Sequence, residues 1–135
     1  METRKIKHAH HDTTQCYSRL NAIGDALYVL GGKWKLRIIM ALSEGNLRFN
    51  ELQRLVKGIS PRVLSNELKE LELNGFVKRH IHTEGTVLVE YELTEYSDTL
   101  GDVLYALSEW GMMHRENIRK QMRTGDVVPA GEAVE

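Results

Sequence analysis

The sequence lacks the features that mark secreted, membrane-embedded or disulfide-stabilised proteins. Its single cysteine, Cys16, excludes an intramolecular disulfide. No apolar run approaches the roughly 20 residues that a membrane-spanning helix needs. No hydrophobic segment follows the charged positions 1–8, so a secretory signal is not expected. We therefore expect a cytoplasmic protein with no membrane partner.

Signatures of catalysis and metal binding are also missing. The sequence contains no recognisable nucleophile–base pair, no paired carboxylates in a catalytic frame and no glycine-rich phosphate loop. His8, His10 and His11 resemble a fragment of a metal site without the ligands that would complete it. We expect no enzyme activity, no cofactor and no bound metal.

The positive and negative charges of the chain nearly balance but are unevenly distributed. The net charge is −1, yet residues 33–82 hold ten Lys or Arg and five Glu, and residues 83–110 hold seven acidic residues and no Lys or Arg. Solvated surface would explain this pattern. A basic face for phosphate, kept apart from an acidic region, would explain it equally well.

Hydrophobic spacing predicts an arm, one domain and a tail. Residues 1–14 are polar and aperiodic and predict a mobile arm, residues 15–124 form the domain, and residues 125–135 form a flexible tail. Within the domain we expect helices over 20–30 and 34–42, a short strand over 47–49, and helices over 50–55 and 60–75. An Asn50–Gln53 capping box is expected to open the helix over 50–55. Strands over 76–82 and 87–93 and a final helix capped by Thr94 follow.

The segment over 60–75 predicts a short helix with two different faces. Leu64, Leu68 and Leu71 form an apolar stripe. Ser60 suits the N-cap and Gly75 suits the C-terminal stop. Because this helix follows another after a short turn and precedes a hairpin, the order of elements predicts a winged helix-turn-helix, a mainly α fold with a small β-hairpin.

Four segments resemble one family in order and spacing. They are Gly31-Gly32-Lys33-Trp34-Lys35, Arg48-Phe49-Asn50-Glu51-Leu52 with Gly58-Ile59-Ser60, Leu71-Glu72-Leu73-Asn74-Gly75-Phe76-Val77, and Val89-Glu90-Tyr91-Glu92-Leu93-Thr94. Together they resemble the HxlR-type bacterial transcriptional regulators, which are relatives of the MarR winged-helix group. The resemblance implies a homodimer that binds operator DNA and is held together by its terminal helices.

The outward face of helix 60–75 supplies the candidate DNA contacts. Arg62 offers a bidentate fork to guanine and Asn66 offers one to adenine. Lys33, Lys35 and Arg54 are either phosphate contacts or charges for solubility. The full set of expected DNA contacts is Ser60, Arg62, Ser65, Asn66, Lys69, Arg48, Lys57, Lys78 and Arg79.

Apolar rows in the first and last helices predict the dimer interface. The expected interface residues are Leu20, Ile23, Leu27, Leu100, Val103, Leu104 and Leu107. Trp34 and Trp110 are expected in the core, with an inducer pocket around Trp110, Tyr105 and Met112 as the alternative. Cys16 is either a small hydrophobe or a redox sensor, although the family cysteine corresponds to a position near Asn21 in this chain.

These patterns favour a sequence-specific transcriptional regulator, expected to be a repressor, that acts as a homodimer on a pseudo-palindromic operator in double-stranded DNA. A small-molecule effector is an optional further partner. The alternative is a winged-helix protein-interaction module without specific DNA binding, which would have an apolar recognition face and little local positive charge.

Overall fold

The computed structural model describes residues 13–125. Its elements are α1 (Thr13–Leu30), α2 (Lys35–Leu42), β1 (Leu47–Arg48), α3 (Phe49–Leu55), α4 (Pro61–Leu73), β2 (Val77–His82), β3 (Leu88–Leu93), a 3₁₀ helix η1 (Glu95–Leu100) and α5 (Gly101–Thr124). Most of the expected arm and tail lies outside the described residues, and α1 begins at Thr13, within the range assigned to the arm.

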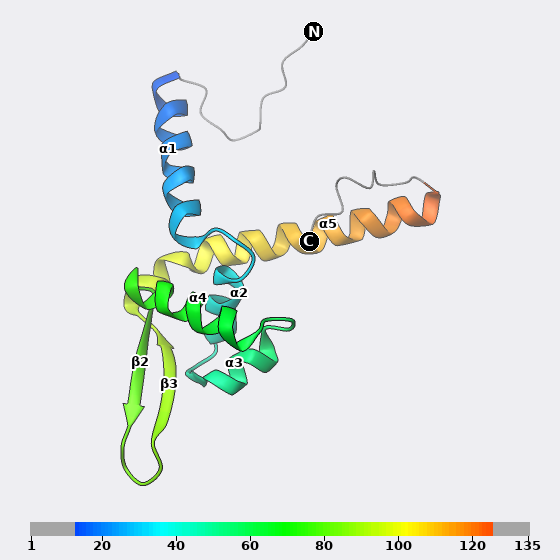
Figure 1. Ribbon diagram of the computed structural model, residues 1–135. Coiled ribbons are helices and arrows are strands. Elements are labelled where there is room, and N and C mark those ends of the chain that lie inside the picture. The colour runs from blue at the N-terminus through cyan, green and yellow to red at the C-terminus, as the bar shows by residue number, and fades with distance from the viewer. Residues whose placement is uncertain (1–12, 126–135) are drawn as a thin grey trace.

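The helices α2, α3 and α4 form a small body from which β2 and β3 extend as a wing (Figure 1). The three strands form an antiparallel sheet in the order β1-β3-β2. α1 projects on the side opposite the wing, and α5 runs away from the body in a third direction (Figure 1). The predicted mainly α architecture with a small hairpin is confirmed.

Local sequence explains where α4 begins and ends. The Ser60 hydroxyl oxygen accepts a hydrogen bond from the backbone N–H of Val63 at 3.2 Å, and Pro61 occupies the first helical position. Gly75 ends the helix with φ +82°, a conformation that side chains with a Cβ disfavour. The predicted stripe of Leu64, Leu68 and Leu71 is buried in the core, which fixes the rotation of α4 about its axis.

A partly buried cluster of ion pairs connects α4 to the start of α2. The Lys35 ammonium lies 3.2 Å from Glu67 and 3.3 Å from Glu70, and Lys35 is only 9 % exposed. Burial alone would lower the pKa of Lys35, but the hydrogen bonds to Glu67 and Glu70 outweigh it and hold the pKa above its ordinary value of 10.5. Lys35 therefore stays charged and holds α4 against α2.

Two hydroxyl groups connect the end of α4 to the start of the last helical segment. Thr94 donates a hydrogen bond to the carbonyl of Gly75, and Ser97 donates one to the carbonyl of Phe76. The backbone N–H of Thr94 also donates to Phe76. Thr94 occupies the N-cap position of η1, as expected, but its hydroxyl group binds the carbonyl of Gly75 and makes no capping hydrogen bond to that helix.

The start of α3 also differs from expectation. The helix begins at Phe49, one residue earlier than predicted, so Asn50 and Gln53 do not form its capping box. The carboxylate of Glu51 instead accepts a hydrogen bond from the backbone N–H of Arg48 at 2.8 Å. An acidic residue at this helical position satisfies a backbone donor that the first turn leaves open.

The core lies between α2, α3, α4 and the roots of the sheet and of α5. Trp34 is partly buried and packs against it, as expected. Trp110 is 57 % exposed and stacks on His114 with 4.9 Å between ring centres, so its assignment to the core is wrong for the single chain. No helix within residues 13–125 combines the length and apolar character of a membrane span.

We predict that Lys35→Met lowers the free energy of unfolding at pH 7 by about 1–3 kcal/mol, because two carboxylates lose their cation. Because the pKa of Lys35 is raised, its contribution is fully present below pH 10.5 and is lost as the pH rises through the higher folded-state value. Urea denaturation followed by circular dichroism, repeated across pH, measures both effects.

Lys120→Met, at an exposed lysine on α5, is the matched control and should change stability by less than about 0.5 kcal/mol. Adding Glu67→Gln and Glu70→Gln to Lys35→Met should restore part of the loss. A Lys35→Met variant as stable as the wild type would show that the cluster does not hold α4.

Candidate nucleic-acid interface

The outward face of α4 presents polar side chains that have no partner in the part of the chain that the structure describes. Arg62, Asn66 and Lys69 are exposed and Ser65 is half-buried. Within residues 13–125, these four side chains take part in no hydrogen bond or ion pair. Their donors are therefore free for an external ligand. The structure places all four on one helix, as the sequence predicted.

Each carboxylate of α4 has a cationic partner within the chain. Glu67 and Glu70 bind Lys35, and Glu72 lies 3.9 Å from the guanidinium of Arg79 on β2. The interpretation of Lys35 as a phosphate contact is wrong, because this side chain is buried beneath α4. Among the described residues, the charges of α4 that remain unpaired are therefore those of Arg62 and Lys69, although the helix as a whole contains more Glu than Lys and Arg.

The end of β1 and the turn before α4 add further cations. Arg48 and Lys57 are exposed, and Ser60 keeps its hydroxyl hydrogen free while its oxygen caps the helix. Sequence reasoning missed Arg37, whose guanidinium lies over the Trp34 ring at 4.9 Å from its centre. The three-residue spacing of Trp34 and Arg37 within a helical segment is the signal that indicates such a contact.

The wing neutralises much of its own charge. Lys78 lies 3.3 Å from Glu92, its cross-strand neighbour, and Arg79 pairs with Glu72 at 3.9 Å. Hydrogen bonds from His80 and then from Lys78 hold the pKa of Glu92 below its ordinary value of 4.5. Both basic residues expected on DNA therefore already have carboxylate partners within the chain, unlike the residues of α4.

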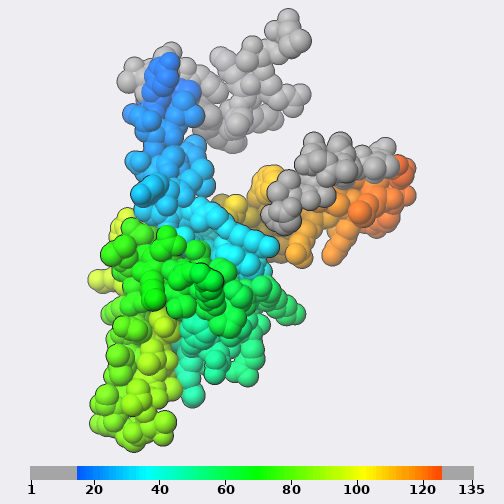
Figure 2. All heavy atoms as spheres, in the orientation of Figure 1, coloured from blue at the N-terminus to red at the C-terminus, as the bar shows by residue number. Residues whose placement is uncertain are grey.

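The expected dimer residues fall into two groups. Leu100 and Leu104 are each 9 % exposed and belong to the core of the chain. The others lie on α1 and α5, which Figure 2 shows projecting from the body. Their exposed fractions are 58 % for Leu20, 58 % for Ile23, 64 % for Leu27, 51 % for Val103 and 50 % for Leu107. Cys16 is also exposed, on α1.

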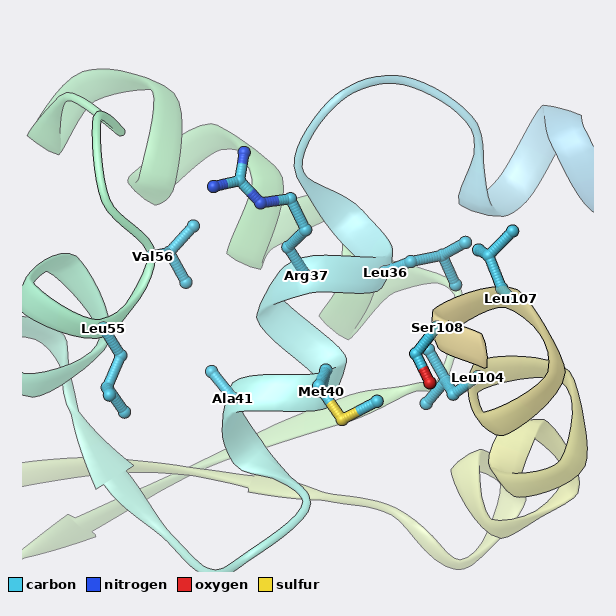
Figure 3. Close-up of a pocket in the computed structure, with 9 residues that line it drawn as sticks. All are labelled: Leu36, Arg37, Met40, Ala41, Leu55, Val56, Leu104, Leu107 and Ser108. Carbon is cyan, nitrogen blue, oxygen red and sulfur yellow. The ribbon is translucent and has the colours of Figure 1, made fainter. Parts of the chain in front are cut away.

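An apolar hollow of about 380 Å³ lies where α2, α3 and α5 meet. Leu36 and Met40 from α2 face Leu104 and Leu107 from α5 across it (Figure 3). Trp110, Tyr105 and Met112, considered from the sequence as an inducer pocket, do not line this hollow. Within residues 13–125, no cluster of three or more His, Cys, Asp or Glu side chains is arranged to hold a metal ion.

Comparison with known proteins identifies the family of the chain. A family model described as HxlR-like helix-turn-helix matches residues 29–119. An uncharacterized HTH-type transcriptional regulator of Halalkalibacterium halodurans is 43 % identical over 95 residues, which cover 70 % of this chain and 84 % of that protein.

Solved structures show the same relationship. The redox regulator HypR in its reduced form superposes with a TM-score of 0.68 at 35 % identity, covering 73 % of this chain and 98 % of HypR. The reduced form of the transcriptional regulator YodB from B. subtilis gives a TM-score of 0.61 at 36 % identity, covering 66 % and 87 % of the two chains. The resemblance drawn from the sequence is confirmed: the chain belongs to the HxlR-like helix-turn-helix family of transcriptional regulators.

Proposed function

We propose that this chain is a sequence-specific DNA-binding regulator that acts in the cytoplasm as a homodimer on a pseudo-palindromic operator. Repression follows where that operator overlaps a promoter. The observation that carries the proposal is the outward face of α4, where Arg62, Asn66 and Lys69 are exposed and unpaired on a helix whose opposite side is buried. A helix fixed in this way suits the major groove.

Within this face, Arg62 has the leading role. It lies in the first turn of α4, directly after the Ser60 cap, and the first turn of a recognition helix enters the groove most deeply. Its guanidinium matches the O6 and N7 acceptors of guanine, and the amide of Asn66 matches the N6 and N7 groups of adenine. Ser65 and Lys69 contribute contacts to base edges or phosphates.

Exposed apolar rows on two helices support the homodimer. Leu20, Ile23 and Leu27 follow one side of α1, while Val103 and Leu107 follow α5, and each is at least half exposed. Large apolar patches of this kind mark interaction surfaces in soluble proteins. A twofold dimer would cover both rows with the same rows of its partner. Recognition helices about 34 Å apart would then fit half-sites one helical turn apart.

The rival function is a winged-helix protein-interaction module. It requires an apolar recognition face, whereas the face of α4 is polar and carries unpaired cations. The observations therefore favour DNA as the partner.

An effector would alter the occupancy of the operator by binding one dimer geometry better than another. The hollow between α2 and α5 lies at the junction where such a change would be transmitted. A redox role for Cys16 stays a prediction.

We predict that Arg62→Ala and Asn66→Ala each reduce discrimination between the operator and a scrambled duplex by about 1–3 kcal/mol, because each removes a bidentate base contact. Electrophoretic shifts on DNA upstream of the gene, at one fixed salt concentration, measure the ratio of the two affinities. Arg115→Ala, at an exposed arginine on α5, is the matched control and should leave the ratio unchanged. Discrimination that survives both α4 substitutions would refute the assignment of α4 as the reading helix.

We also predict that Ile23→Asp and Leu107→Asp, made together, convert a dimer into a monomer, because a charge buried in an apolar interface is costly. Analytical ultracentrifugation should give twice the chain mass for the wild type and the single mass for the variant. Ile81→Asp, at an exposed isoleucine of the wing, should remain dimeric. A monomeric wild type at micromolar concentration would contradict the proposed assembly.

A further inference from the structure

Trp34 carries two cations on its ring at the start of α2. The Lys33 ammonium lies 5.1 Å from the ring centre and the Arg37 guanidinium lies 4.9 Å from it. Both side chains are exposed. Contacts between a cation and an aromatic face at these distances are attractive, and they restrict long flexible side chains that would otherwise sample many rotamers.

The same group reaches the turn that precedes the recognition helix. Arg37 donates a hydrogen bond from Nη2 to the carbonyl of Lys57 at 3.4 Å. The Trp34 ring lies beside Gly58, since a Cβ added at Gly58 would be 3.8 Å from the ring, and this glycine has φ +89°. Lys33 and Arg37 are thus held beside the backbone of the turn that carries Lys57, although more than 20 residues separate Lys33 from Lys57.

No carboxylate among the described residues forms an ion pair with these three charges. Within residues 13–125, no ion pair involves Lys33, Arg37 or Lys57. The nearby acidic residues Glu67 and Glu70 are already bound to Lys35. The N-terminus of α2 has no side-chain cap and no acidic residue in its first turn, so the positive end of the helix dipole adds to the same field.

We propose that Lys33, Arg37 and Lys57 form a second DNA contact, which binds backbone phosphate beside the half-site read by α4. This inference rests on the proposed function and adds the residues that position the reading helix. The turn that carries Lys57 leads directly into Ser60 and the N-terminus of α4, so a phosphate held there fixes how α4 enters the groove. Trp34 acts as a platform that holds Lys33 and Arg37 in place before DNA arrives.

Losing a phosphate contact affects DNA affinity differently from losing a base contact. Phosphate contacts release counterions and carry no sequence information, so their loss weakens all duplexes equally and reduces the dependence of affinity on salt. Loss of a base contact such as Arg62 instead changes the ratio between duplexes. The two roles are therefore separable in one set of measurements.

The experiment measures affinity against salt concentration for the upstream duplex and a scrambled duplex. The double variant Lys33→Gln with Arg37→Gln should reduce the slope of log affinity against log salt by about two, with the ratio between duplexes unchanged. The control pair Arg115→Gln with Lys120→Gln removes the same charge from α5 and should keep the wild-type slope. Lys33→Arg with Arg37→Lys keeps both charges and should also retain the slope.

Three results would overturn the inference. The first is a wild-type salt dependence of affinity in Lys33→Gln with Arg37→Gln. The second is an equal loss of salt dependence in Lys33→Arg with Arg37→Lys. The third is a change only in the ratio of affinities for the two duplexes. Failure of the proposed function appears differently, as a wild-type chain that binds both duplexes with equal affinity. In that case the slopes on the scrambled duplex still decide whether Lys33 and Arg37 contact phosphate. A wild-type chain that binds neither duplex would refute both proposals.

Discussion

Which charges of α4 are left unpaired depends on one shielded lysine. Lys35 binds Glu67 and Glu70, and Arg79 lies beside Glu72, so each carboxylate of α4 has a cation next to it, whereas Arg62 and Lys69 have no carboxylate partner among the described residues. The leucine stripe fixes the rotation of the helix, and the ion pairs offset the charge of its acidic residues. A negatively charged duplex would be repelled by the same helix if these carboxylates were free.

The basic side chains of the protein consequently differ in whether a carboxylate lies beside them. On the wing, Lys78 and Arg79 have carboxylates within 4 Å, and much of their field is cancelled there. On α4 and around Trp34 the cations have no such partners within the described chain. The net charge of −1 conceals this division, because composition counts charges without regard to their neighbours. The surface around α4 is therefore better suited to phosphate than the wing.

The features of α4 that neighbouring residues set could be predicted from the sequence, whereas features set by distant pairs could not. The Ser60 cap, the leucine spacing of α4 and the stop at Gly75 all depend on local geometry. The role of Lys35 depends on residues 32 and 35 positions away, and the neutralised wing depends on the cross-strand register of Lys78 and Glu92. Trp110 has helical spacing suited to burial, but a single chain provides nothing to cover it, so the pattern alone could not say where it would lie.

The hydrogen bonds of Thr94 and Ser97 connect the residues that lead into α5 with the residues that follow α4. These hydroxyls hold the carbonyls of Gly75 and Phe76, immediately after the recognition helix. α5 has 24 residues and is therefore about 36 Å long. Because η1 leads directly into α5, a tilt of the far end of α5 would reach the residues that follow α4 through these hydrogen bonds. Since the distal turns lie far from those bonds, a large displacement there would correspond to only a small rotation of α4.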